Sequence, residues 1–508
     1  MSSTTATSTT RLHELLALQA QREPTATALW WQGQATSYAH LQARVARLAQ
    51  RLASAGKPGD RIGVLAFNGP EFIELMYAAA ASGRILVPLN ARLAPPEWCY
   101  QLDASGVSLL FADAELLQAL RADPGAPQAL PAVDLQGGYA QWLEGPQASL
   151  PATAADDPVW ILYTSGSTGR PKGAVLTHRS FLAGLESAAL ARPVLPGDTY
   201  LYPFPLFHVA AHNVLLQHQY GAAVVLLRSF SPEATLRACR EQRVTTLSLA
   251  PTMIAMLLDD PAFSPADFAS VRTIGYGASA MPEILLRRLL ADTGVGLCQS
   301  YGMTELSGSA AFLTVEDHQR AVAGQPELLR TVGKPLATVE LKVVDEAGAT
   351  CLPGVAGEVL VKAPQCMSGY WQQPEATAAA LVNGWLHTGD VGRFDSAGYL
   401  SIVDRKKDMI ISGGENVASR EVEEVLRNHP AVKDCAVIGL PDAQWGEQVA
   451  AVLVLDGEAS DGELAAHCRA RLAGYKTPKT WRRVPALPLN AAGKVDKPVL
   501  RAEARERS

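Results

Sequence analysis

The sequence lacks the marks of a secreted, disulfide-bonded or metal-scaffolded protein. Its seven cysteines are scattered over 508 residues and include no C-x-x-C pair, which predicts free thiols in a reducing compartment and no zinc site. The first ten residues contain neither a basic stretch nor an apolar core, so we expect a disordered tail over residues 1–10 and no secretory signal. An apolar run of about 18 residues, the length that a membrane span requires, is also absent, and we expect a cytoplasmic protein.

Neither sign of charge is in strong excess. Charged residues make up 19% of the chain and the net charge is −6, which argues against a general binder of nucleic acid or of anionic membranes. Hydrophobic residues make up 48%, an ordinary share for a globular protein. A chain of 508 residues is too long for one ordinary core, so two or more domains are expected.

Two familiar catalytic motifs are missing, and a third is weak. No G-x-S-x-G elbow occurs, which counts against an α/β-hydrolase, and no segment fits the Walker A loop G-x-x-x-x-G-K-[ST]. Gly275 to Ala280 reads as G-x-G-x-x-A, but no acidic residue about twenty positions later is well placed to bind a ribose. A dinucleotide oxidoreductase would rest on this segment alone.

The most informative stretch that is present runs from Val159 to Gly173. An apolar run, typical of a buried strand, leads into YTSGSTGRPKG. Its glycines let the backbone approach a ligand closely, its hydroxyls and backbone N–H groups suit an anion, and Arg170 and Lys172 add positive charge. A flexible Ser/Gly linker is the alternative, but linkers seldom follow directly on a buried strand. The stretch therefore predicts a phosphate-binding loop.

Helical and strand patterns alternate along most of the chain, which predicts a layered α/β architecture with largely parallel strands. Residues 124–157 are expected to form a connecting loop, and residues 331–361 an antiparallel subdomain. After about residue 404 we expect a small α+β domain with two helices, one beginning at a capping box of Ser460 and Glu463. Strands are expected at 61–66, 85–89, 107–111, 222–227, 244–249, 271–276 and 295–299, and helices at 41–52 and 72–81.

At the phosphate loop the chain resembles the acyl-adenylate-forming family, which includes acyl-CoA synthetases, luciferases and the adenylation domains of peptide synthetases. The family loop reads YTSGSTGxPKG, every fixed position matches, and the resemblance extends from about residue 20 to about residue 500. It implies a large N-terminal domain (11–403) of layered α/β subdomains with a small β-barrel-like subdomain. It also implies a hinge (404–408) and a small mobile α+β lid domain (409–508).

The resemblance implies ATP and Mg²⁺ as cofactors and assigns their contacts. Thr304 would hydrogen-bond the α-phosphate, while Glu305 and Thr164 would hold the metal, since Mg²⁺ prefers oxygen ligands shared with phosphates. Asp390 would accept the ribose hydroxyls, with Arg405 as a second ribose contact. The implied nucleotide-binding positions are Thr164, Ser165, Gly166, Ser167, Thr168, Gly169, Lys172, Gly277, Ala278, Ser300, Tyr301, Gly302, Met303, Thr304, Asp390 and Arg405.

The same resemblance implies positions for the second domain and for both other substrates. Lys494 matches the catalytic lysine of the adenylation step, and Lys407 matches the hinge. Coenzyme A would contact Ser412, Gly413, Gly414, Trp445, Tyr475, Lys476 and Lys479. His208 matches a position beside the acyl carboxylate, and the acyl pocket is implied at His208, Val209, Ala210, Asn213, Tyr276, Gly277, Gly302, Ser307 and Gly308.

Each of these residues also has a plainer structural explanation. Thr304 and Glu305 could begin a helix, Asp390 could lie in a turn, and Lys407 and Lys494 could be solvated surface lysines. The aromatic residues at 445 and 475 could pack in a core. The departures at Tyr276 and Ser279 from the family's Gly-Ala-x-Pro-like segment leave details of the pocket open.

Together these motifs predict an ATP-dependent acyl-CoA synthetase that acts through an acyl-AMP intermediate. The small residues of the implied pocket favour a hydrophobic acid, aryl, arylpropenoic or medium-to-long-chain aliphatic. An aspartate that amino-acid-activating relatives carry near His208 is absent, which argues against an α-amino acid. The alternative is an acyl-AMP ligase that loads a carrier protein. No nucleic-acid partner is expected, and a homodimer is considered without a motif that supports it.

Overall fold

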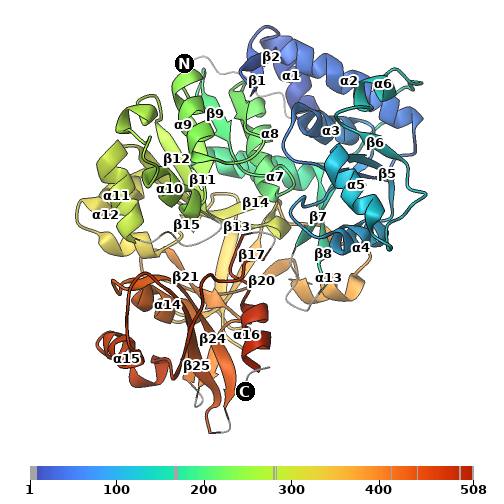
Figure 1. The fold of residues 1–508 in the computed structure, drawn as a ribbon. Coiled ribbons are helices and arrows are strands. Elements are labelled where there is room, and N and C mark those ends of the chain that lie inside the picture. Colours follow the sequence, from blue (N-terminus) through green and yellow to red (C-terminus); the bar gives the residue numbers. More distant parts are fainter. Residues whose placement is uncertain are drawn as a thin grey trace. The chain divides into compact units, whose positions relative to one another are not determined.

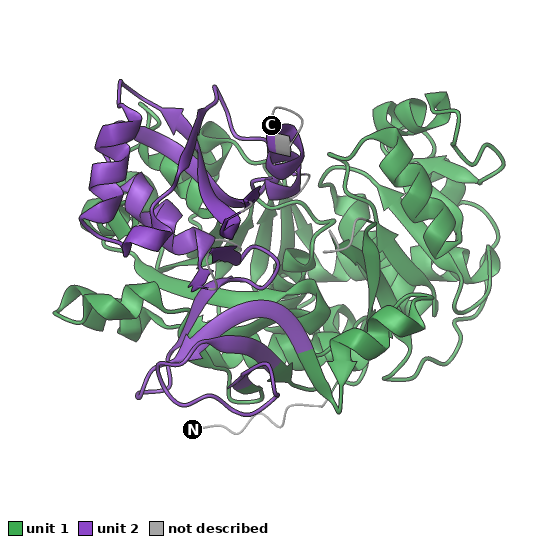
Figure 2. Cartoon of the chain, turned by 90° about the horizontal axis from the view of Figure 1, so that it is seen from below, with its two compact units in different colours: residues 1–341, 361–386 green, residues 342–360, 387–508 purple. Residues whose placement is uncertain are grey.

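The computed structural model describes residues 9–164, 170–277, 281, 283–412, 415–442, 444–490 and 493–505 (Figure 1). The chain divides into two compact units (Figure 2). Unit 1 comprises residues 1–341 and 361–386, and unit 2 comprises residues 342–360 and 387–508. The mixed α/β fold class with a large and a small part is as the sequence predicts. The domain boundaries at 403/404 and 408/409 stay predictions.

Unit 1 contains a nine-stranded sheet whose inner strands run parallel. Its spatial order is β15 (Lys334–Pro335), β14 (Gly308–Leu313), β13 (Gly296–Met303), β12 (Thr273–Gly277), β11 (Thr246–Leu249), β9 (Thr199–Tyr202), β10 (Ala223–Leu226), β1 (Thr27–Trp31) and β2 (Gln34–Ser37). The parallel crossovers pass through helices, as such connections require: α8 (His212–Gln219), α9 (Pro232–Glu241), α10 (Pro251–Leu258) and α11 (Glu283–Thr293).

A seven-stranded sheet forms the other layer of unit 1. Its order is β18 (Gly369–Tyr370), β8 (Lys172–Thr177), β7 (Pro158–Thr164), β4 (Ile85–Pro88), β3 (Arg61–Leu65), β5 (Val107–Ala112) and β6 (Ala132–Asp134). β7, β4, β3, β5 and β6 pair in parallel, and β8 is antiparallel to β7. Helices of this region are α2 (Tyr38–Ser54), α3 (Pro70–Ala81), α4 (Pro95–Ser105), α5 (Ala114–Ala122) and α6 (Tyr139–Leu143).

Helices α2 and α3 illustrate why these segments fold as they do. The Ser37 side chain caps α2 by accepting a hydrogen bond from the His40 N–H, and one face of the helix buries Leu41, Val45 and Leu48. α3 begins with Pro70 in its first turn and is buried from Phe72 to its end. A helix that is apolar on every side belongs in a core, and each fully buried large side chain contributes roughly 1.5–3 kcal/mol.

The remaining helices of unit 1 complete its layers. α1 (Glu14–Arg22) and α7 (His178–Ala191) are near α8, and α12 (Val315–Val322) follows β14. The short strand β19 (Leu381–Val382) follows α13 (Pro374–Ala380). In the part of the chain that is described, no helix combines the length and apolarity needed to cross a membrane. All seven cysteines are free thiols, as expected.

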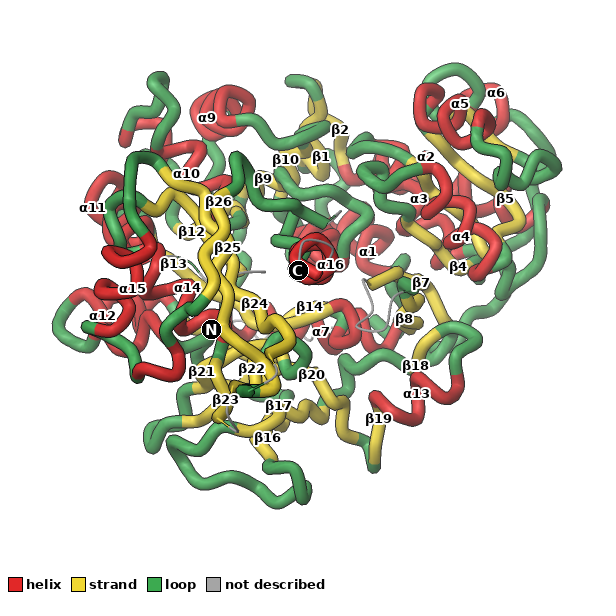
Figure 3. Tube along the Cα trace, turned by 60° about the horizontal axis from the view of Figure 1, so that its bottom comes forward, coloured by secondary structure: helices red, strands yellow, loops and turns green. Residues whose placement is uncertain are grey.

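Unit 2 contains strands of two separate sheets. β16 (Glu340–Val344), β17 (Gly357–Lys362) and β20 (Trp385–Phe394) lie mostly in unit 2, and β20 pairs antiparallel with β21 (Leu400–Arg405). The second sheet has the order β23-β22-β25-β24, with β26 beside β25, and Figure 3 shows β24 and β25 running side by side. Its strands are β22 (Ile410–Ser412), β23 (Glu415–Val417), β24 (Val432–Asp442), β25 (Gly446–Leu455) and β26 (Thr480–Arg483).

Three expectations differ from the structure. The C-terminal region has three helices in its described part, α14 (Ser419–Arg427), α15 (Asp461–Arg469) and α16 (Lys497–Arg505), where two were expected. Residues 124–157 form β6 and α6 besides connecting loops, because β6 extends the parallel sheet at its edge. β13 continues to Met303, four residues beyond the expected end at Gln299, because β14 pairs with it antiparallel there. The capping box of Ser460 and Glu463 does start α15.

Candidate active site

The predicted phosphate loop joins two antiparallel strands of the seven-stranded sheet. β7 ends at Thr164 and β8 begins at Lys172, and these two residues are direct partners in the pairing of the strands. The hydroxyl of Thr164 and the ammonium group of Lys172 thus stand at the two ends of the loop. Other loop residues assigned to the nucleotide lie outside the described residues: Ser165, Gly166, Ser167, Thr168 and Gly169.

A buried carboxylate lies beside these loop ends. Glu305 belongs to the short helix η3 (Thr304–Leu306) and is 8% exposed. Its Oε1 accepts hydrogen bonds from the Thr164 hydroxyl at 3.4 Å and from the Tyr370 hydroxyl at 3.0 Å. Its backbone carbonyl accepts the Met367 N–H at 2.8 Å. The structure thus brings together the two predicted metal ligands, Glu305 and Thr164, which are 141 residues apart in the sequence.

Tyr370 is a member of this cluster that the sequence analysis missed. Desolvation and the charge of Glu305 raise the pKa of Tyr370 well above its ordinary value, so its hydroxyl remains protonated and donates. The Lys172 ammonium lies 5.2 Å from the centroid of the tyrosine ring, within the range of a cation–π contact. The sequence contains no local signal for this residue, because Tyr370 reaches the cluster through the pairing of the short strand β18 with β8.

The cluster fits a hard divalent cation such as Mg²⁺. Glu305 uses Oε1 for both hydrogen bonds, and its Oε2 has no hydrogen-bond partner among the described residues. A carboxylate oxygen and a neighbouring hydroxyl are donors that Mg²⁺ accepts, with substrate phosphates and water completing its shell. No group of three or more His, Cys, Asp or Glu side chains suited to a metal occurs in the described ranges.

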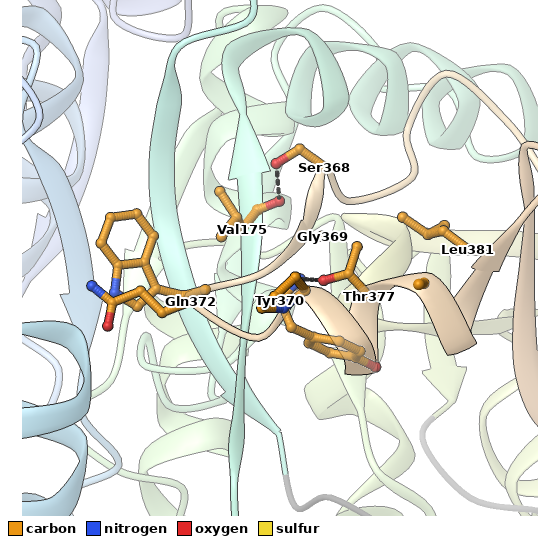
Figure 4. A pocket seen from close by; sticks show the side chains of 10 residues that line it. Val175, Ser368, Gly369, Tyr370, Gln372, Thr377 and Leu381 are labelled. Atoms are coloured by element: carbon orange, nitrogen blue, oxygen red, sulfur yellow. Dashed lines mark hydrogen bonds between the residues drawn. The ribbon is translucent and has the colours of Figure 1, made fainter.

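Tyr370 also borders a surface groove of about 430 Å³ between β8 and α13 (Figure 4). The Tyr370 N–H donates to the Thr377 hydroxyl at 2.8 Å, and the Ser368 hydroxyl donates to the Val175 carbonyl. These bonds hold β18 and the start of α13 against β8. The groove is lined by Val175, Ser368, Gly369, Tyr370, Trp371, Gln372, Pro374, Thr377, Ala378 and Leu381.

Glycines bring the ends of β12, β13 and β14 very close together. Gly277 pairs with Ser300, and a Cβ atom on Gly277 would lie 2.7 Å from the Ser300 carbonyl oxygen. A Cβ atom on Gly302 would collide with the backbone at Gly308. Only glycine fits at such an approach. Tyr301 and Met303, two further predicted nucleotide contacts, flank Gly302 in β13, while Ala278 lies outside the described residues.

The predicted acyl-pocket residues come from three segments. His208, Val209, Ala210 and Asn213 lie in and around η1 (Val209–Ala211) and the start of α8. The His208 ring packs edge-on against Phe207, with ring centroids 4.7 Å apart, and the Asn213 side chain donates to the Ala210 carbonyl at 3.0 Å.

Two of the predicted pocket residues, Ser307 and Tyr276, are buried. Ser307 is fully buried in a left-handed conformation (φ 49°), and its hydroxyl has no hydrogen-bond partner within the described part of the chain. The Tyr276 hydroxyl contacts Nε2 of His318 at 2.8 Å, so it is engaged in a buried polar contact. Gly308, by contrast, packs against the ring of His212. His212 is a residue that the sequence analysis did not single out.

In unit 2, the predicted ribose contacts form an ion pair. Asp390 of β20 and Arg405 of β21 are direct strand partners, and Arg405 Nε lies 2.8 Å from Asp390 Oδ1. Asp390 is 3% exposed, and its backbone N–H donates to the Thr388 hydroxyl. The pairing of these strands therefore places a carboxylate and a guanidinium side by side, at two positions that the resemblance assigns to the ribose.

Lys494 belongs to the same neighbourhood of unit 2. A turn positions it: its N–H donates to the Asn490 side chain at 3.1 Å, and the Asn490 N–H donates to its carbonyl at 2.7 Å. The residue as a whole is exposed, while its ammonium group is partly desolvated. Desolvation and the charge of Arg405 lower the pKa of Lys494, against the opposite effect of Asp390. The predicted catalytic lysine is therefore close enough to the ribose pair to be influenced by its charges.

The predicted hinge lies between strands β21 and β22. Lys407 is exposed, and its neighbours are held on both sides. The Lys406 N–H donates to the Gly389 carbonyl at 2.8 Å. The Asp404 carboxylate accepts the Ser419 N–H and hydroxyl at 2.6 and 2.7 Å, and Asp408 pairs with Arg501 at 2.8 Å. Lys407 is thus an exposed residue between anchored neighbours.

The predicted coenzyme A contacts include two exposed aromatic residues accompanied by cations. Trp445 is 41% exposed, and the Lys479 ammonium lies 4.1 Å from its ring centroid. Tyr475 is 40% exposed and has Lys476 5.8 Å from its ring, while Lys476 also pairs with Glu421 at 2.6 Å. Because both aromatic residues are exposed, they are not packed in a core, which was the alternative explanation for them. Ser412 is buried, and Gly413 and Gly414 lie outside the described residues.

The chain is similar in sequence to known proteins along most of its length. Residues 16–371 match the model of the AMP-binding enzymes, and residues 421–494 match the model of the AMP-binding enzyme C-terminal domain. A feruloyl-CoA synthase of Streptomyces sp is 40% identical over 497 residues, covering 96% of this chain and 97% of the relative. A fatty acid–[acyl-carrier-protein] ligase of Streptomyces coeruleorubidus is 37% identical over 509 residues, covering 98% of this chain and 96% of the relative.

A solved structure gives the same result for the fold. The o-succinylbenzoate CoA synthetase of Bacillus subtilis, in complex with its acyl-adenylate intermediate, superposes with a TM-score of 0.86 at 33% sequence identity. The match covers 97% of each chain.

Proposed function

The chain belongs to the AMP-binding enzymes, and on that premise we propose that it is an ATP-dependent acid–thiol ligase that joins a hydrophobic carboxylic acid to coenzyme A. The observation that carries this proposal is the cluster of Glu305, Thr164, Tyr370 and Lys172 at the ends of the phosphate loop. It supplies a metal ligand, a hydroxyl donor and a cation at one place. These are the groups that phosphoryl transfer needs.

The first half-reaction activates the acid. A carboxylate is a poor acyl donor, because its charge repels nucleophiles and its leaving group would be oxide. Attack of a carboxylate oxygen on the α-phosphorus of ATP forms the acyl–phosphate bond and breaks the bond to pyrophosphate. Negative charge grows on the phosphoryl oxygens, so positioned cations and donors do most of the work.

The chain's own residues take distinct parts in this step. Lys172 attracts the phosphates, the Thr304 hydroxyl donates to the α-phosphate, and Lys494 stabilises the charge that develops during transfer. Glu305, which the Tyr370 and Thr164 hydroxyls hold in place, and Thr164 would hold Mg²⁺. When bound, the metal neutralises phosphate charge. Asp390 accepts the ribose hydroxyls while Arg405 fixes its orientation.

The second half-reaction transfers the acyl group. The thiol of coenzyme A attacks the acyl carbonyl, the bond to AMP breaks, and the thiol proton is released. Rotation about Lys407 would remove Lys494 and admit the thiol, so that one site serves both steps. Trp445 and Tyr475 stack on the nucleotide of coenzyme A, and Lys476 and Lys479 attract its phosphates. We place this activity in the cytoplasm, where ATP and reduced coenzyme A are available.

Loading of a carrier protein remains the second candidate. It is favoured by the similarity to the ligase that is named for an acyl-carrier protein. The exposed pairing of Trp445 with Lys479 favours coenzyme A, because an aromatic face beside a cation suits a nucleotide with phosphates.

The test is pyrophosphate release from ATP and Mg²⁺ across a panel of carboxylic acids, with and without coenzyme A. Turnover that needs one class of acid and coenzyme A is the expected result. Release that stops after one equivalent and ignores coenzyme A would point to a carrier-protein acceptor. No release with any acid would refute the ligase.

A further inference from the structure

His212 is a buried histidine that the proposed reaction does not use. It opens helix α8 and is 7% exposed. Its Nδ1 lies 2.8 Å from the Val209 carbonyl oxygen. A carbonyl oxygen can only accept a hydrogen bond, so Nδ1 carries the ring proton and Nε2 carries a lone pair. Nε2 of His212 is therefore a hydrogen-bond acceptor.

This tautomer persists at neutral pH. Burial lowers the pKa of His212, and the bond to Val209 offsets this only in part. Nε2 has no hydrogen-bond partner among the residues that the structure describes. The buried imidazoles of His218 and His318, by contrast, use both ring nitrogens. Among the described residues, Nε2 is not one of the fully buried atoms that lack a hydrogen-bond partner, so a small donor such as water or a ligand hydroxyl can reach it.

The ring lies against the glycines of the proposed acyl pocket. A Cβ atom on Gly308 would be 3.1 Å from Cε1 and 3.4 Å from Nε2 of His212. Gly308 in turn pairs with Met303 and closely approaches Gly302. The neighbouring side chains of Val209 and Ala210 are apolar. Nε2 is thus a hydrogen-bond acceptor beside glycines and small apolar side chains of the proposed pocket, which also contains the polar side chains of Asn213 and Ser307.

We propose that His212 selects acids whose hydrophobic tail carries a hydroxyl group, which donates a hydrogen bond to Nε2. This inference rests on the proposed function and narrows its substrate class. An acid without the hydroxyl leaves Nε2 unpaired, and an acid with a methyl ether presents only a second acceptor. Phenolic hydroxyls and hydroxyls at the end of an aliphatic chain share the required chemistry.

The experiment compares kcat/KM for matched acids in the complete reaction with ATP, Mg²⁺ and coenzyme A. One series is 4-hydroxycinnamate, cinnamate and 4-methoxycinnamate, and the other is 8-hydroxyoctanoate and octanoate, so the two sources of the hydroxyl are distinguished. The wild type is expected to prefer the hydroxylated member of one series by roughly tenfold or more, the effect of one buried hydrogen bond. His212→Leu removes the acceptor and should bring the ratio near one. His212→Gln restores an acceptor and should recover part of the preference.

Two results would overturn the inference while leaving the ligase intact: equal kcat/KM within both series for the wild type, or an undiminished preference in His212→Leu. If the leucine variant does not fold, the wild-type ratios and the glutamine variant still decide. Failure of the proposed function has a different signature, since no acid in either series would then release pyrophosphate.

Discussion

Glu305 shows how a single side chain acquires its chemistry from its surroundings. The residue is almost completely buried, and its Oε1 accepts hydrogen bonds from two hydroxyl groups. These bonds fix the orientation of the carboxyl group and leave Oε2 for a cation. The same carboxylate on a surface helix would be an ordinary solvated group.

We predict that Glu305→Gln lowers kcat for pyrophosphate release by roughly a hundredfold or more, because the neutral amide loses the anionic ligand to Mg²⁺. Titration with Mg²⁺ should show a higher concentration at half-maximal activity. Tyr370→Phe serves as the matched control, since it removes one donor but keeps the carboxylate, and its loss should be smaller. Wild-type Mg²⁺ dependence in Glu305→Gln would exclude this residue as the metal ligand.

Lys494 is the other residue on which the mechanism depends. We predict that Lys494→Ala abolishes formation of acyl-AMP but spares thioester formation from supplied acyl-AMP, because the cation is needed only while phosphoryl charge develops. Each half-reaction is measured separately, with Lys433→Ala, an exposed lysine of β24, as the control. Since the pKa of Lys494 is lowered, the first half-reaction should lose activity on the alkaline side at a pH below the lysine's ordinary pKa. Equal loss in both halves would contradict the assignment.

At the scale of elements, the segment around the connection between β21 and β22 contains residues that hydrogen bonds and ion pairs hold in place, and among them the exposed residue Lys407. Asp404 accepts a hydrogen bond at the start of α14, and Asp408 forms an ion pair with a residue of α16. Lys406 donates its N–H to a carbonyl of β20 and pairs through its side chain with Glu358 of β17. A backbone rotation is most easily absorbed at an exposed residue between such anchors. Lys407 is exposed between these anchors, and we therefore propose it as the site of the rotation.

We predict that Lys407→Pro impairs the second half-reaction at least tenfold more than the first, because proline fixes φ near −65° and restricts the residue before it. Single-turnover rates of acyl-AMP formation and of thioester formation give the two values. Lys407→Ala removes the charge but keeps the backbone free, so it should behave like the wild type. If the proline variant performs both halves normally, the rotation does not occur at Lys407.

At the scale of the whole molecule, two buried histidines join segments of unit 1 that are remote in sequence. Nε2 of His218 donates to the Ala28 carbonyl, and its Nδ1 accepts from the Tyr77 hydroxyl, so that α8, β1 and α3 are tied together. His178 at the start of α7 accepts the Leu12 N–H at 3.0 Å. Burial lowers the pKa of each histidine to about 4.

These shifts predict a loss of stability in mild acid. In the unfolded chain each histidine binds a proton below about pH 6.5, whereas in the folded state it remains neutral down to about pH 4. The contribution of each neutral histidine to the free energy of unfolding is therefore complete above pH 6.5. It is lost as the pH falls to 4, at up to about 1.4 kcal/mol per pH unit for each histidine. The prediction is checked by measuring the midpoint of thermal unfolding at pH values from about 7.5 to about 4.5, a window around the ordinary histidine pKa. The midpoint should fall as the pH falls.

The control for this prediction is a pair of substitutions. His218→Gln removes one titrating group and should flatten the decline, although it lowers stability at pH 7, whereas exposed His40→Gln should leave the decline unchanged. A midpoint that does not fall with pH would show that these histidines are not held neutral.

Much of the fold and of the site could be read from local patterns. The strand that leads from Val159 to Thr164, the helices α2 and α3 and the parallel strands follow from periodicity and turn residues, which depend on neighbours in the sequence. The extension of β13 to Met303 could not be read, because it requires the distant pairing with β14. The same holds for β6, which is short and gains its place only at the edge of a sheet.

The sequence by itself determined the family resemblance and predicted a phosphate-binding loop and candidate residues for each substrate, because those signals lie within short segments. Only the tertiary structure decided which side chains meet. Tyr370 reaches Glu305 across 65 residues, and His212 turns its ring to Gly308 because α8 starts beside β14. Contacts of this kind depend on how strands order themselves in a sheet, and that order is set by packing of the whole chain.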